Sequence, residues 1–246
     1  VAVGFASNAS GTIHPIRQMS DAAHKVGAKF YVDAVHYAPH GLIDVEALGC
    51  DFLVASAYKF FGPHVGILWG KREYLEALPS EKLRPCDSAL PWSMMSGTPN
   101  LEGIAGTKAA IEYIAGLSQL PETESLRTRI QASFQAIEVY EKALLKRLLH
   151  GLKETDFRIL GIEDVERIDE RVPTLSLVHP THTTETAARY LAEQGIFAWS
   201  GNHYAVPFTE EMGIEPEGTL RIGLLHYNTA SEVDRLVDAL KILSKA

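Results

Sequence analysis

Cysteine and long apolar runs are both scarce in this sequence. Only two cysteines, Cys50 and Cys86, occur among its 246 residues. Two cysteines are too few for a disulfide scaffold and are typical of a reducing compartment such as the cytoplasm. No apolar run approaches the ~20 residues that a membrane-spanning helix needs. We therefore expect a cytoplasmic protein without a membrane partner.

Positive charge is also in short supply. The chain has 23 lysine and arginine residues against 31 aspartate and glutamate residues, which gives a formal net charge of −8. A protein that binds the phosphate backbone usually shows a basic patch or stripe, so nucleic acid is not an expected partner. A small anionic ligand is compatible with this charge, because a local pocket can be positive on an acidic protein.

Several common site motifs are missing. The sequence contains no P-loop, no G-x-S-x-G and no G-x-G-x-x-G. His36 and His40 stand four residues apart, but no third ligand accompanies them, and Pro39 would disrupt a helix there. We therefore expect no metal site.

Short apolar segments alternate with amphipathic segments in the first half of the chain. The patterns predict strands at residues 1–7, 29–32, 51–55 and 65–69, and helical segments at residues 15–26 and 45–48. This alternation is typical of an α/β sheet. Residues 76–100 carry four prolines without clear periodicity and are expected to form a long loop.

The second half of the chain has longer predicted helices than the first half. Helices are predicted at residues 104–117, 122–152, 184–194 and 231–245, and strands at residues 157–160, 174–178, 196–199 and 219–224. We expect residues 1–120 to form the C-terminal part of a large domain with a mainly parallel sheet. Residues 121–246 are expected to form the long helix and a smaller C-terminal α+β domain.

Polar residues follow three of the predicted strands. They are Ser7-Asn8, Asp33 with His36, and Ser56 with Lys59. Ligands of open α/β sheets bind outside the carboxyl ends of the strands, so neighbouring strands would bring these side chains to one crevice. Lys59 interrupts an apolar run, and lysine is rarely buried without a partner.

An aspartate and a lysine at such positions suit pyridoxal phosphate. A lysine in a desolvated pocket has a lowered pKa and can form a Schiff base with an aldehyde. Pyridoxal phosphate needs that lysine, and it needs a carboxylate at its ring nitrogen to act as an electron sink. The residues alone leave another interpretation open, in which Asp33 and Lys59 form a buried ion pair or Lys59 extends to the surface.

Four stretches, in order and spacing, resemble the class V aminotransferase family, and within it the cysteine desulfurase and selenocysteine lyase branch. They are S-N-A-S-G-T-I-H-P-I, V-D-A-V-H-Y-A-P-H, D-F-L-V-A-S-A-Y-K-F-F-G-P and S-G-T-P-N-L-E-G-I. The resemblance covers the whole chain and implies a homodimeric, pyridoxal-phosphate-dependent α/β enzyme of fold type I. It also implies that the chain is a C-terminal fragment, so we expect residues 1–246 alone to be inactive.

The resemblance assigns cofactor contacts in the first half of the chain. Lys59 would carry the Schiff base, and Asp33 would pair with the pyridinium nitrogen. Ser56 would contact the phosphate, and Tyr58 could also reach it. His36 stands where desulfurases usually place a glutamine that hydrogen-bonds the phenolic oxygen of the cofactor, which an imidazole N–H can do as well.

The resemblance also assigns residues that meet the substrate or the second subunit. Asn8 would lie near the phenolic oxygen and the substrate carboxylate. Thr98 would reach the phosphate held by the other subunit. Arg221 would clamp the substrate carboxylate, for which a guanidinium is well suited. The alternative for Arg221 is a surface arginine on an edge strand.

Besides His36, the chain departs from the desulfurase pattern at three further aligned positions. Tyr58 replaces the histidine that usually precedes the lysine. Tyr204 stands at the position of the persulfide-forming cysteine, and Trp199 replaces the usual arginine of that loop. A thiolate is essential for taking sulfur from cysteine, and tyrosine cannot substitute for it. Cys86 is the remaining candidate thiol, although an ordinary loop cysteine is the simpler interpretation.

These features support a pyridoxal-phosphate enzyme that acts on a small amino acid. Lyase or sulfurtransferase chemistry of the desulfurase type comes first by resemblance, and transamination or epimerisation is the alternative that Tyr204 favours. His203 would act as an acid or base near the substrate, or would hold its loop. A non-catalytic scaffold is the rival from another class, but it would not need both Asp33 and Lys59.

Overall fold

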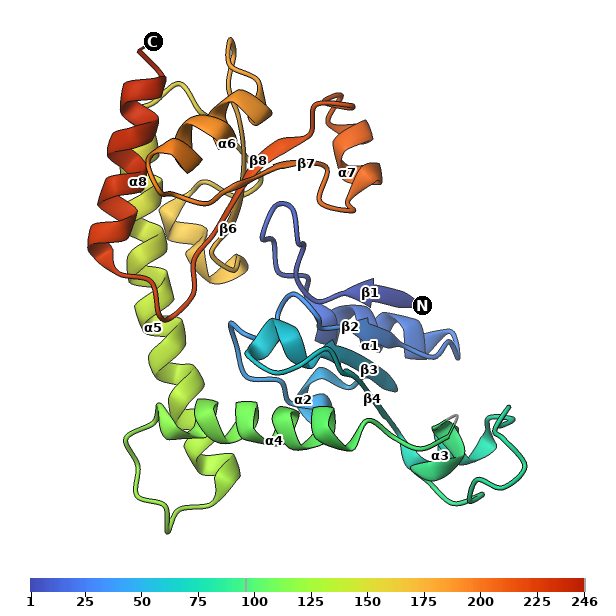
Figure 1. Ribbon diagram of the computed structural model, residues 1–246. Coiled ribbons are helices and arrows are strands. Elements are labelled where there is room, and N and C mark those ends of the chain that lie inside the picture. The colour runs from blue at the N-terminus through green and yellow to red at the C-terminus, as the bar shows by residue number, and fades with distance from the viewer. Residues whose placement is uncertain (96, 246) are drawn as a thin grey trace. The chain divides into compact units, whose positions relative to one another are not determined.

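The computed structural model of the chain describes residues 1–95 and 97–245 (Figure 1). It divides into two compact units: residues 1–5 with 15–133, and residues 6–14 with 134–246. Each unit contains its own four-stranded sheet. Ser96, which falls in the predicted loop and in the S-G-T-P-N stretch, lies outside the described residues.

The first unit has a mixed sheet in the strand order β1-β2-β3-β4. The strands are β1 (Ala2–Gly4), β2 (Tyr31–Asp33), β3 (Phe52–Ser56) and β4 (Gly66–Gly70). The strands β1, β2 and β3 are parallel, and β4 pairs antiparallel with β3. The carboxyl ends of β1, β2 and β3 therefore share one edge of the sheet.

The helices of this unit follow the strands in alternation. They are α1 (Ile16–Lys25), α2 (Val45–Leu48), η1 (Ala57–Phe60), α3 (Arg72–Ala77), η2 (Trp92–Met94) and α4 (Leu101–Gly116). The predicted α/β alternation is confirmed. The short η1, α3 and η2 were not predicted, because three to six residues carry too little periodicity to register as a helix.

Local signals explain where the short helix α2 begins and ends. The side chain of Asp44 accepts hydrogen bonds from the backbone N–H groups of Glu46 and Ala47, which caps the helix N-terminus. Gly49 ends the helix with φ of 69°, a left-handed conformation that glycine adopts at little cost. The chain then turns directly into β3.

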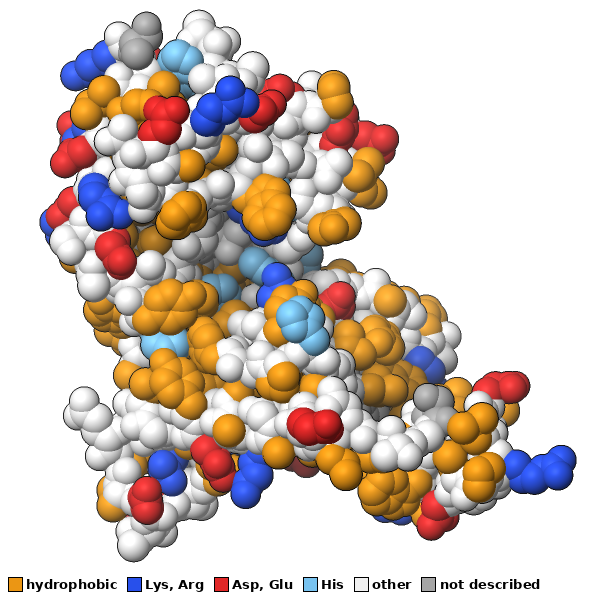
Figure 2. All heavy atoms as spheres, in the orientation of Figure 1, with side chains coloured by type: hydrophobic (Ala, Val, Ile, Leu, Met, Phe, Trp, Pro, Cys, Tyr) orange, Lys and Arg blue, Asp and Glu red, His pale blue; other side chains and the backbone are white. Residues whose placement is uncertain are grey.

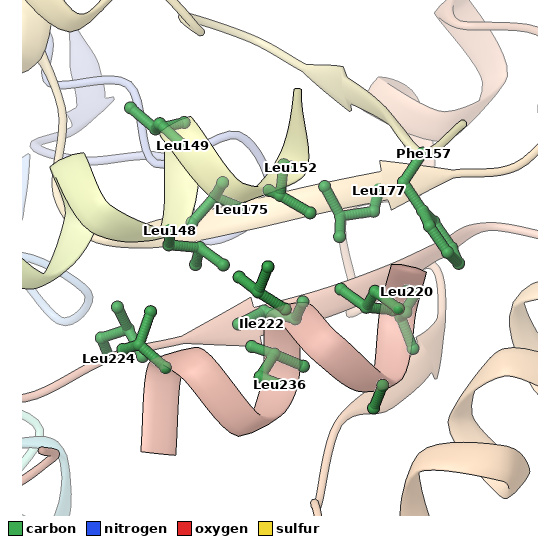
Figure 3. Packing of buried hydrophobic residues seen from close by; sticks show 14 of the residues in the cluster. Leu148, Leu149, Leu152, Phe157, Leu175, Leu177, Leu220, Ile222, Leu224 and Leu236 are labelled. Atoms are coloured by element: carbon green, nitrogen blue, oxygen red, sulfur yellow. The ribbon is translucent and has the colours of Figure 1, made fainter. Parts of the chain in front are cut away.

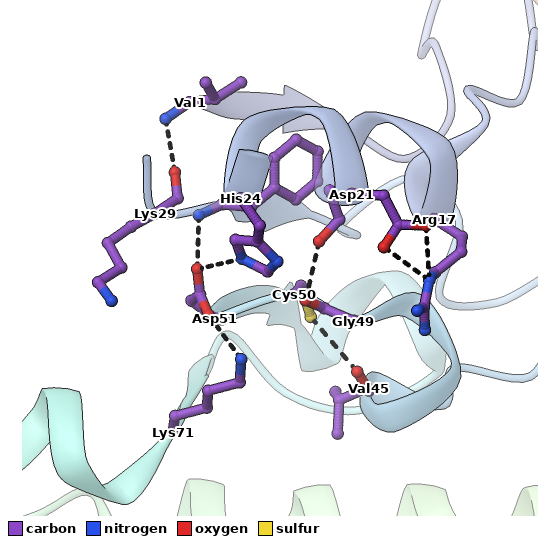
Figure 4. A network of polar contacts seen from close by, with 12 residues as sticks. Val1, Arg17, Asp21, His24, Lys29, Val45, Gly49, Cys50, Asp51 and Lys71 are labelled. Carbon is purple, nitrogen blue, oxygen red and sulfur yellow. Dashed lines mark hydrogen bonds and ion pairs between the residues drawn. The ribbon is translucent and has the colours of Figure 1, made fainter. Parts of the chain in front are cut away.

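A buried carboxylate ties the elements of the first unit together (Figure 4). Asp51 is 1% exposed and accepts hydrogen bonds from Lys71 Nζ at 2.7 Å, His24 Nε2 at 2.9 Å and the Phe30 backbone N–H at 2.8 Å. Burial alone would raise the pKa of this carboxyl, but these hydrogen bonds outweigh it and lower the pKa to about 2. Asp51 is therefore a charged anchor between α1, β2 and the end of β4.

The second unit has an antiparallel sheet in the strand order β5-β6-β8-β7. Its strands are β5 (Arg158–Leu160), β6 (Thr174–Val178), β7 (Trp199–Gly201) and β8 (Thr219–Gly223). Its helices are η3 (Val165–Glu170), α6 (Thr184–Glu193), α7 (Val206–Glu211) and α8 (Ala230–Leu243). The division between the units falls within α5 (Leu126–Leu152).

One face of the second sheet is apolar and the other is polar. Successive strand residues point to opposite faces, so Leu175 and Leu177 of β6 lie on the same side as Leu220 and Ile222 of β8. This side packs against leucines of α5 and α8 in a single core cluster (Figure 3). The opposite face of the same strands carries Ser176, Thr219 and Arg221.

Charges of both signs are interspersed on the molecular face drawn in Figure 2.

Within the described ranges 1–95 and 97–245, no helix combines the length and apolar character needed to cross a membrane. Over the same ranges, no three His, Cys, Asp or Glu side chains are grouped so that they could hold a metal ion.

Candidate functional site

Asp33 and Lys59 follow two neighbouring parallel strands at the same edge of the first sheet. Asp33 is the last residue of β2 and pairs in register with Val54 of β3. Ser56 ends β3, and Lys59 lies in the single 3₁₀ turn η1 that begins directly after it. The sheet order makes β2 and β3 neighbours, which was the condition for their terminal polar residues to lie close together.

The turn that carries Lys59 is tightly closed. The backbone N–H of Gly62 donates to the carbonyl of Ala57 at 2.8 Å, and Phe61 has φ of 75°. A non-glycine residue with positive φ is uncommon and is found most often where the surrounding structure holds it in place. This closure fixes the backbone around Lys59, whose side chain is half-buried.

Aromatic rings lie beside the lysine. Lys59 Nζ is 5.3 Å from the centroid of the Tyr58 ring, and the half-exposed Tyr58 ring stacks on His64 with 4.8 Å between the ring centroids. A phenol hydroxyl can hydrogen-bond an anion but carries no positive charge. His64, which sequence reasoning missed, brings an imidazole next to Tyr58 from six residues downstream.

Asp33 is exposed at the end of β2, and its local geometry is defined by short-range contacts. Its Oδ1 atom accepts a hydrogen bond from the Val35 backbone N–H at 2.9 Å, an Asx turn that orients the carboxylate. The half-buried His36 follows in the next turn, with its ring centroid 5.8 Å from that of His40. Burial lowers the pKa of His40 to about 4, so His40 is neutral at physiological pH.

The groups at this edge suit a phosphorylated pyridine aldehyde. Lys59 offers a primary amine for the aldehyde, and Asp33 offers a carboxylate for a protonated ring nitrogen. Ser56 and Tyr58 offer hydroxyl donors for a phosphate. All four residues belong to the first unit. The donor set at the end of this sheet could therefore hold such a cofactor.

Thr98 lies elsewhere in the first unit, in the segment between α3 and α4. It is exposed and lines a cavity of about 330 Å³ together with Cys86, Asp87, Trp92 and Gly97. Cys86 is a half-buried free cysteine, whereas Cys50 is completely buried, as expected for a packed core residue. Thr98 and Cys86 thus share a cavity that the sequence did not reveal.

Asn8, His203 and Arg221 come together in the second unit. Arg221 Nη1 donates to the backbone carbonyl of Asn8 at 3.1 Å, and Asn8 Nδ2 donates to the backbone carbonyl of His203 at 2.8 Å. Arg221 lies on β8, between β6 and β7, so it is not on an edge strand. Burial lowers the pKa of its guanidinium from the ordinary value.

His203 is buried and holds its loop from within. Its Nε2 atom lies 3.1 Å from both the carbonyl and the hydroxyl oxygen of Thr219, and a carbonyl can only accept, so Nε2 carries the hydrogen. Burial and the nearby charge of Arg221 lower the pKa of His203, opposed by the bond to Thr219. The His203 imidazole is neutral, and its Nε2–H is already hydrogen-bonded to Thr219. This favours the alternative in which His203 holds its loop over the one in which it acts as an acid or base.

The two aromatic residues of this loop point outward. Tyr204 is fully exposed, and both it and His203 have positive φ values of 60° and 55°. Trp199 is 72% exposed and pairs in register with Arg221, so their side chains share the polar face of the second sheet. The loop therefore presents a phenol at its tip and an indole beside Arg221.

Comparison with known proteins identifies relatives over the full span of this chain. A family model described as "Aminotransferase class-V" matches residues 1–236. A "Cysteine desulfurase" of Pectobacterium carotovorum is 31% identical over 255 residues, which cover 98% of this chain and 57% of that protein. A "Cysteine desulfurase" of Cronobacter sakazakii is 32% identical with the same coverage of both chains. The chain thus spans little more than half the length of these relatives.

Solved structures of cysteine desulfurases also match this chain over nearly its whole length. The apo structure of a cysteine desulfurase from Thermococcus onnurineus matches with a TM-score of 0.85 and 28% identity, over 100% of this chain and 60% of that one. A cysteine desulfurase from Escherichia coli matches with a TM-score of 0.78 and 29% identity, over 98% and 58%. The α/β fold is that of these enzymes, and the chain belongs to the class V aminotransferase family, among relatives named cysteine desulfurases.

Proposed function

We propose that this protein is a pyridoxal-phosphate-dependent enzyme that acts on an amino acid, with lyase chemistry of the desulfurase type. The observation that carries the proposal is the placement of Asp33 and Lys59 at the carboxyl ends of neighbouring parallel strands. Ligands of α/β sheets bind at such ends. The names of the relatives add cysteine, or an amino acid like it, as the first substrate to test.

The residues of the first unit would hold the cofactor. Bound pyridoxal phosphate would supply an electron-withdrawing pyridinium ring that weakens the bonds at the substrate α-carbon. Lys59 would hold the aldehyde carbon through Nζ and would also move the proton of the α-carbon. Asp33 would keep the ring nitrogen protonated, Ser56 and Tyr58 would hold the phosphate, and His36 would donate to the phenolic oxygen.

The residues of the second unit would bind the substrate. Arg221 would clamp the carboxylate, because a guanidinium offers paired donors in a fixed plane. Its contact with the Asn8 carbonyl fixes the side chain from one side and keeps it on the polar face of the second sheet. Asn8 would be the second polar group beside that carboxylate.

Tyr204 decides between the reactions. By the family resemblance, it would stand at the position where desulfurases carry the nucleophilic cysteine, and a phenol cannot accept sulfur from a cysteine substrate. We infer that this protein releases its product without loading sulfur on this loop. Transamination or epimerisation is the second candidate, because both need Lys59 and Arg221 but no thiol.

The remaining parts of the proposal concern the assembly. A homodimer is proposed from the family resemblance, with Thr98 reaching the phosphate held by the second subunit. The cytoplasm is proposed as the location, because a chain with only two cysteines is typical of a reducing compartment. Small amino acids are the proposed partners, and neither nucleic acid nor membrane is proposed.

Borohydride reduction tests the cofactor site directly. The full-length protein is incubated with pyridoxal phosphate, reduced with borohydride and digested, and the peptides are mapped by mass spectrometry. A pyridoxyl group on Lys59 is expected, and Lys59→Arg should abolish the label. Lys71 is a suitable internal control, because it is paired with Asp51 and should stay unlabelled. A stably folded protein without label on Lys59 would leave the scaffold interpretation standing instead.

A panel of amino acids then separates the reactions. Cysteine, alanine, serine and selenocysteine are assayed for sulfide or selenide, pyruvate, keto acid and racemised product. The assays contain a thiol reductant, because desulfuration of cysteine to alanine leaves sulfur at the zero oxidation state and a reductant must convert it to sulfide. Alanine with sulfide then indicates desulfuration, whereas pyruvate with ammonia indicates elimination. Keto acid that forms only when an amino acceptor is present indicates transamination.

A further inference from the structure

The segment Ala6–His14 folds with the second unit, although the residues on both sides of it belong to the first unit. The segment is closed by its own backbone: the Ser7 N–H donates to the Thr12 carbonyl at 2.9 Å, and the Gly11 N–H donates to the Ser7 carbonyl at 3.0 Å. It carries Asn8, the residue whose carbonyl Arg221 contacts. Whatever fixes this segment therefore fixes the surroundings of Arg221.

Backbone pairing holds one end of the segment. The Val172 N–H donates to the Gly11 carbonyl at 2.8 Å, and the Ile13 N–H donates to the Glu170 carbonyl at 2.8 Å. Ser176 Oγ on the polar face of β6 adds a hydrogen bond to the Ala9 carbonyl at 2.9 Å. These contacts join the segment to residues more than 150 positions away in the chain.

Arg171 lies at the centre of this junction and is only 3% exposed. Its Nη2 atom donates to the carbonyls of Ser10 at 3.2 Å and Thr174 at 2.6 Å, and its Nη1 atom donates to the carbonyl of Ile162. Burial lowers the pKa of this guanidinium to about 10, so it stays charged at neutral pH. Its hydrogen-bond partners within residues 1–95 and 97–245 are backbone carbonyls.

Burying a cation among neutral carbonyls costs desolvation free energy, so a buried arginine is expected at this position only if it has a role there. Lysine could not replace it, because only the planar guanidinium donates to several carbonyls in fixed directions. The segment also packs too closely against Arg171 to accept a larger residue at Gly11. A Cβ atom at Gly11 would lie 2.8 Å from the Val172 carbonyl and 3.2 Å from Arg171 Nη2. The junction is thus built to one geometry.

We propose that Arg171 is a positioning residue that fixes the Ala6–His14 segment on the polar face of the second sheet and so sets Asn8 and Arg221 for the substrate carboxylate. Arg171 contacts the segment at Ser10, two residues after Asn8, and acts on the substrate only through it. The functional half of this inference rests on the proposed function, whereas the structural half does not.

Hydrogen exchange in the full-length apoprotein tests the structural half. In Arg171→Lys, the amides of Ser7, Gly11 and Ile13 should exchange about tenfold faster or more, as expected when buried hydrogen bonds to a charged donor are lost. The amides of β6 and β8 should change little. Arg167→Lys is the matched control, because Arg167 is exposed and pairs with Glu170 at the surface. The control should leave the segment unchanged.

Binding of the amino-acid substrate tests the functional half. Arg171→Lys should raise KM, or the dissociation constant of an unreactive carboxylate analogue, by about tenfold to a hundredfold, because a small displacement of a binding group is that costly. The value of kcat should change far less. A uniform rise in exchange over the second unit, or an unchanged Ala6–His14 segment, would overturn the proposal.

A second variant covers the case in which Arg171→Lys does not fold. Gly11→Ala keeps the arginine but displaces the segment from it, so it should reproduce both the local exchange and the rise in KM. Unchanged exchange in a folded Gly11→Ala protein would also overturn the proposal. If the exchange result is positive and Lys59 takes no pyridoxyl label, the proposed function fails while the structural role of Arg171 stands.

Discussion

Arg221 Nη1 and the backbone carbonyl of Asn8 are joined by a 3.1 Å hydrogen bond on the polar face of the second sheet. The two residues are 213 positions apart in the chain, and the bond is made from an interior strand. An arginine placed in this way has lost part of its hydration, which makes it a stronger partner for a carboxylate than an arginine on the surface.

The first prediction concerns Arg221 itself. Arg221→Gln should weaken substrate binding by roughly 2–5 kcal/mol, the range found when one partner of a buried charged pair is removed. Arg221→Lys should recover part of the loss, because it restores the charge but not the paired donors. Titration of the cofactor absorbance with amino acid gives the affinities. Unaltered affinity in Arg221→Gln would show that the carboxylate binds elsewhere.

The second prediction concerns the buried Asp51. Its folded pKa of about 2 lies below the ordinary value of 3.8, so its contribution to stability is complete above pH 3.8 and is lost as the pH falls towards 2. Asp51→Asn should therefore cost about 2 kcal/mol or more at neutral pH, and the difference from wild type should shrink below pH 4.

Denaturant unfolding of the full-length protein at several pH values measures this difference. Asp21→Asn is the matched control, because Asp21 is an exposed carboxylate of the same unit that pairs with Arg17 on its own helix. The control should lose at most about 0.5 kcal/mol. Equal losses in the two variants would contradict the anchoring role of Asp51.

The third prediction concerns Glu141, a carboxyl of α5 that is 3% exposed. Burial raises its pKa to about 9, although the backbone N–H of His226 opposes the shift. A raised pKa means that its contribution to stability is complete below the ordinary value of 4.5 and is lost as the pH rises towards 9. Wild type should lose roughly 1 kcal/mol per pH unit over this range relative to Glu141→Gln.

Unfolding midpoints at pH 5.5 and 8.5 give the comparison. Glu141→Gln should be more stable than wild type at the higher pH. Folding of wild type there must either keep the Glu141 carboxyl protonated or bury its charge, and both cost free energy, whereas the amide of glutamine does not titrate. The exposed Glu193 provides the control, and Glu193→Gln should follow wild type at both pH values. A constant difference between wild type and Glu141→Gln would show that Glu141 is ionised in the folded protein.

Local pattern predicted most elements of the fold, and long-range contacts account for what it missed. The helices at α1 and α4 and the strand β6 follow their predicted periodicity closely. The strand β7 begins at Trp199, where the predicted strand ends, because its position is set by pairing with β8 rather than by its own residues. The helix α7 has a proline at its start and only six residues, so it gave no periodic signal.

The candidate site divides in the same way. Asp33 and Lys59 could be found because each follows its own strand, and strand ends are a local feature. Arg171 could not be found, because a single arginine before an alternating strand reads as a surface residue. Its role depends on the fold of residues 6–14 against the second unit, across 161 positions of the chain.

The last prediction concerns Tyr204, at the tip of a loop held from within by His203. The side chain is fully exposed, so a cysteine there would be accessible to a small sulfur donor. If only the missing thiol prevents sulfur loading, Tyr204→Cys should acquire cyanide-releasable sulfane sulfur on incubation with cysteine and pyridoxal phosphate. Wild type and Tyr204→Phe should not.

The experiment is cleanest in a Cys86→Ser background, because Cys86 is only half-buried whereas Cys50 is fully buried. Peptide mapping must place the sulfur on residue 204, and Lys59→Arg in the same background must abolish it. Sulfur loading of wild type that disappears with Cys86→Ser would instead make Cys86 the acceptor. Absence of loading in a folded, cofactor-labelled Tyr204→Cys protein would show that the substrate is not positioned for desulfuration, which would favour transamination or epimerisation.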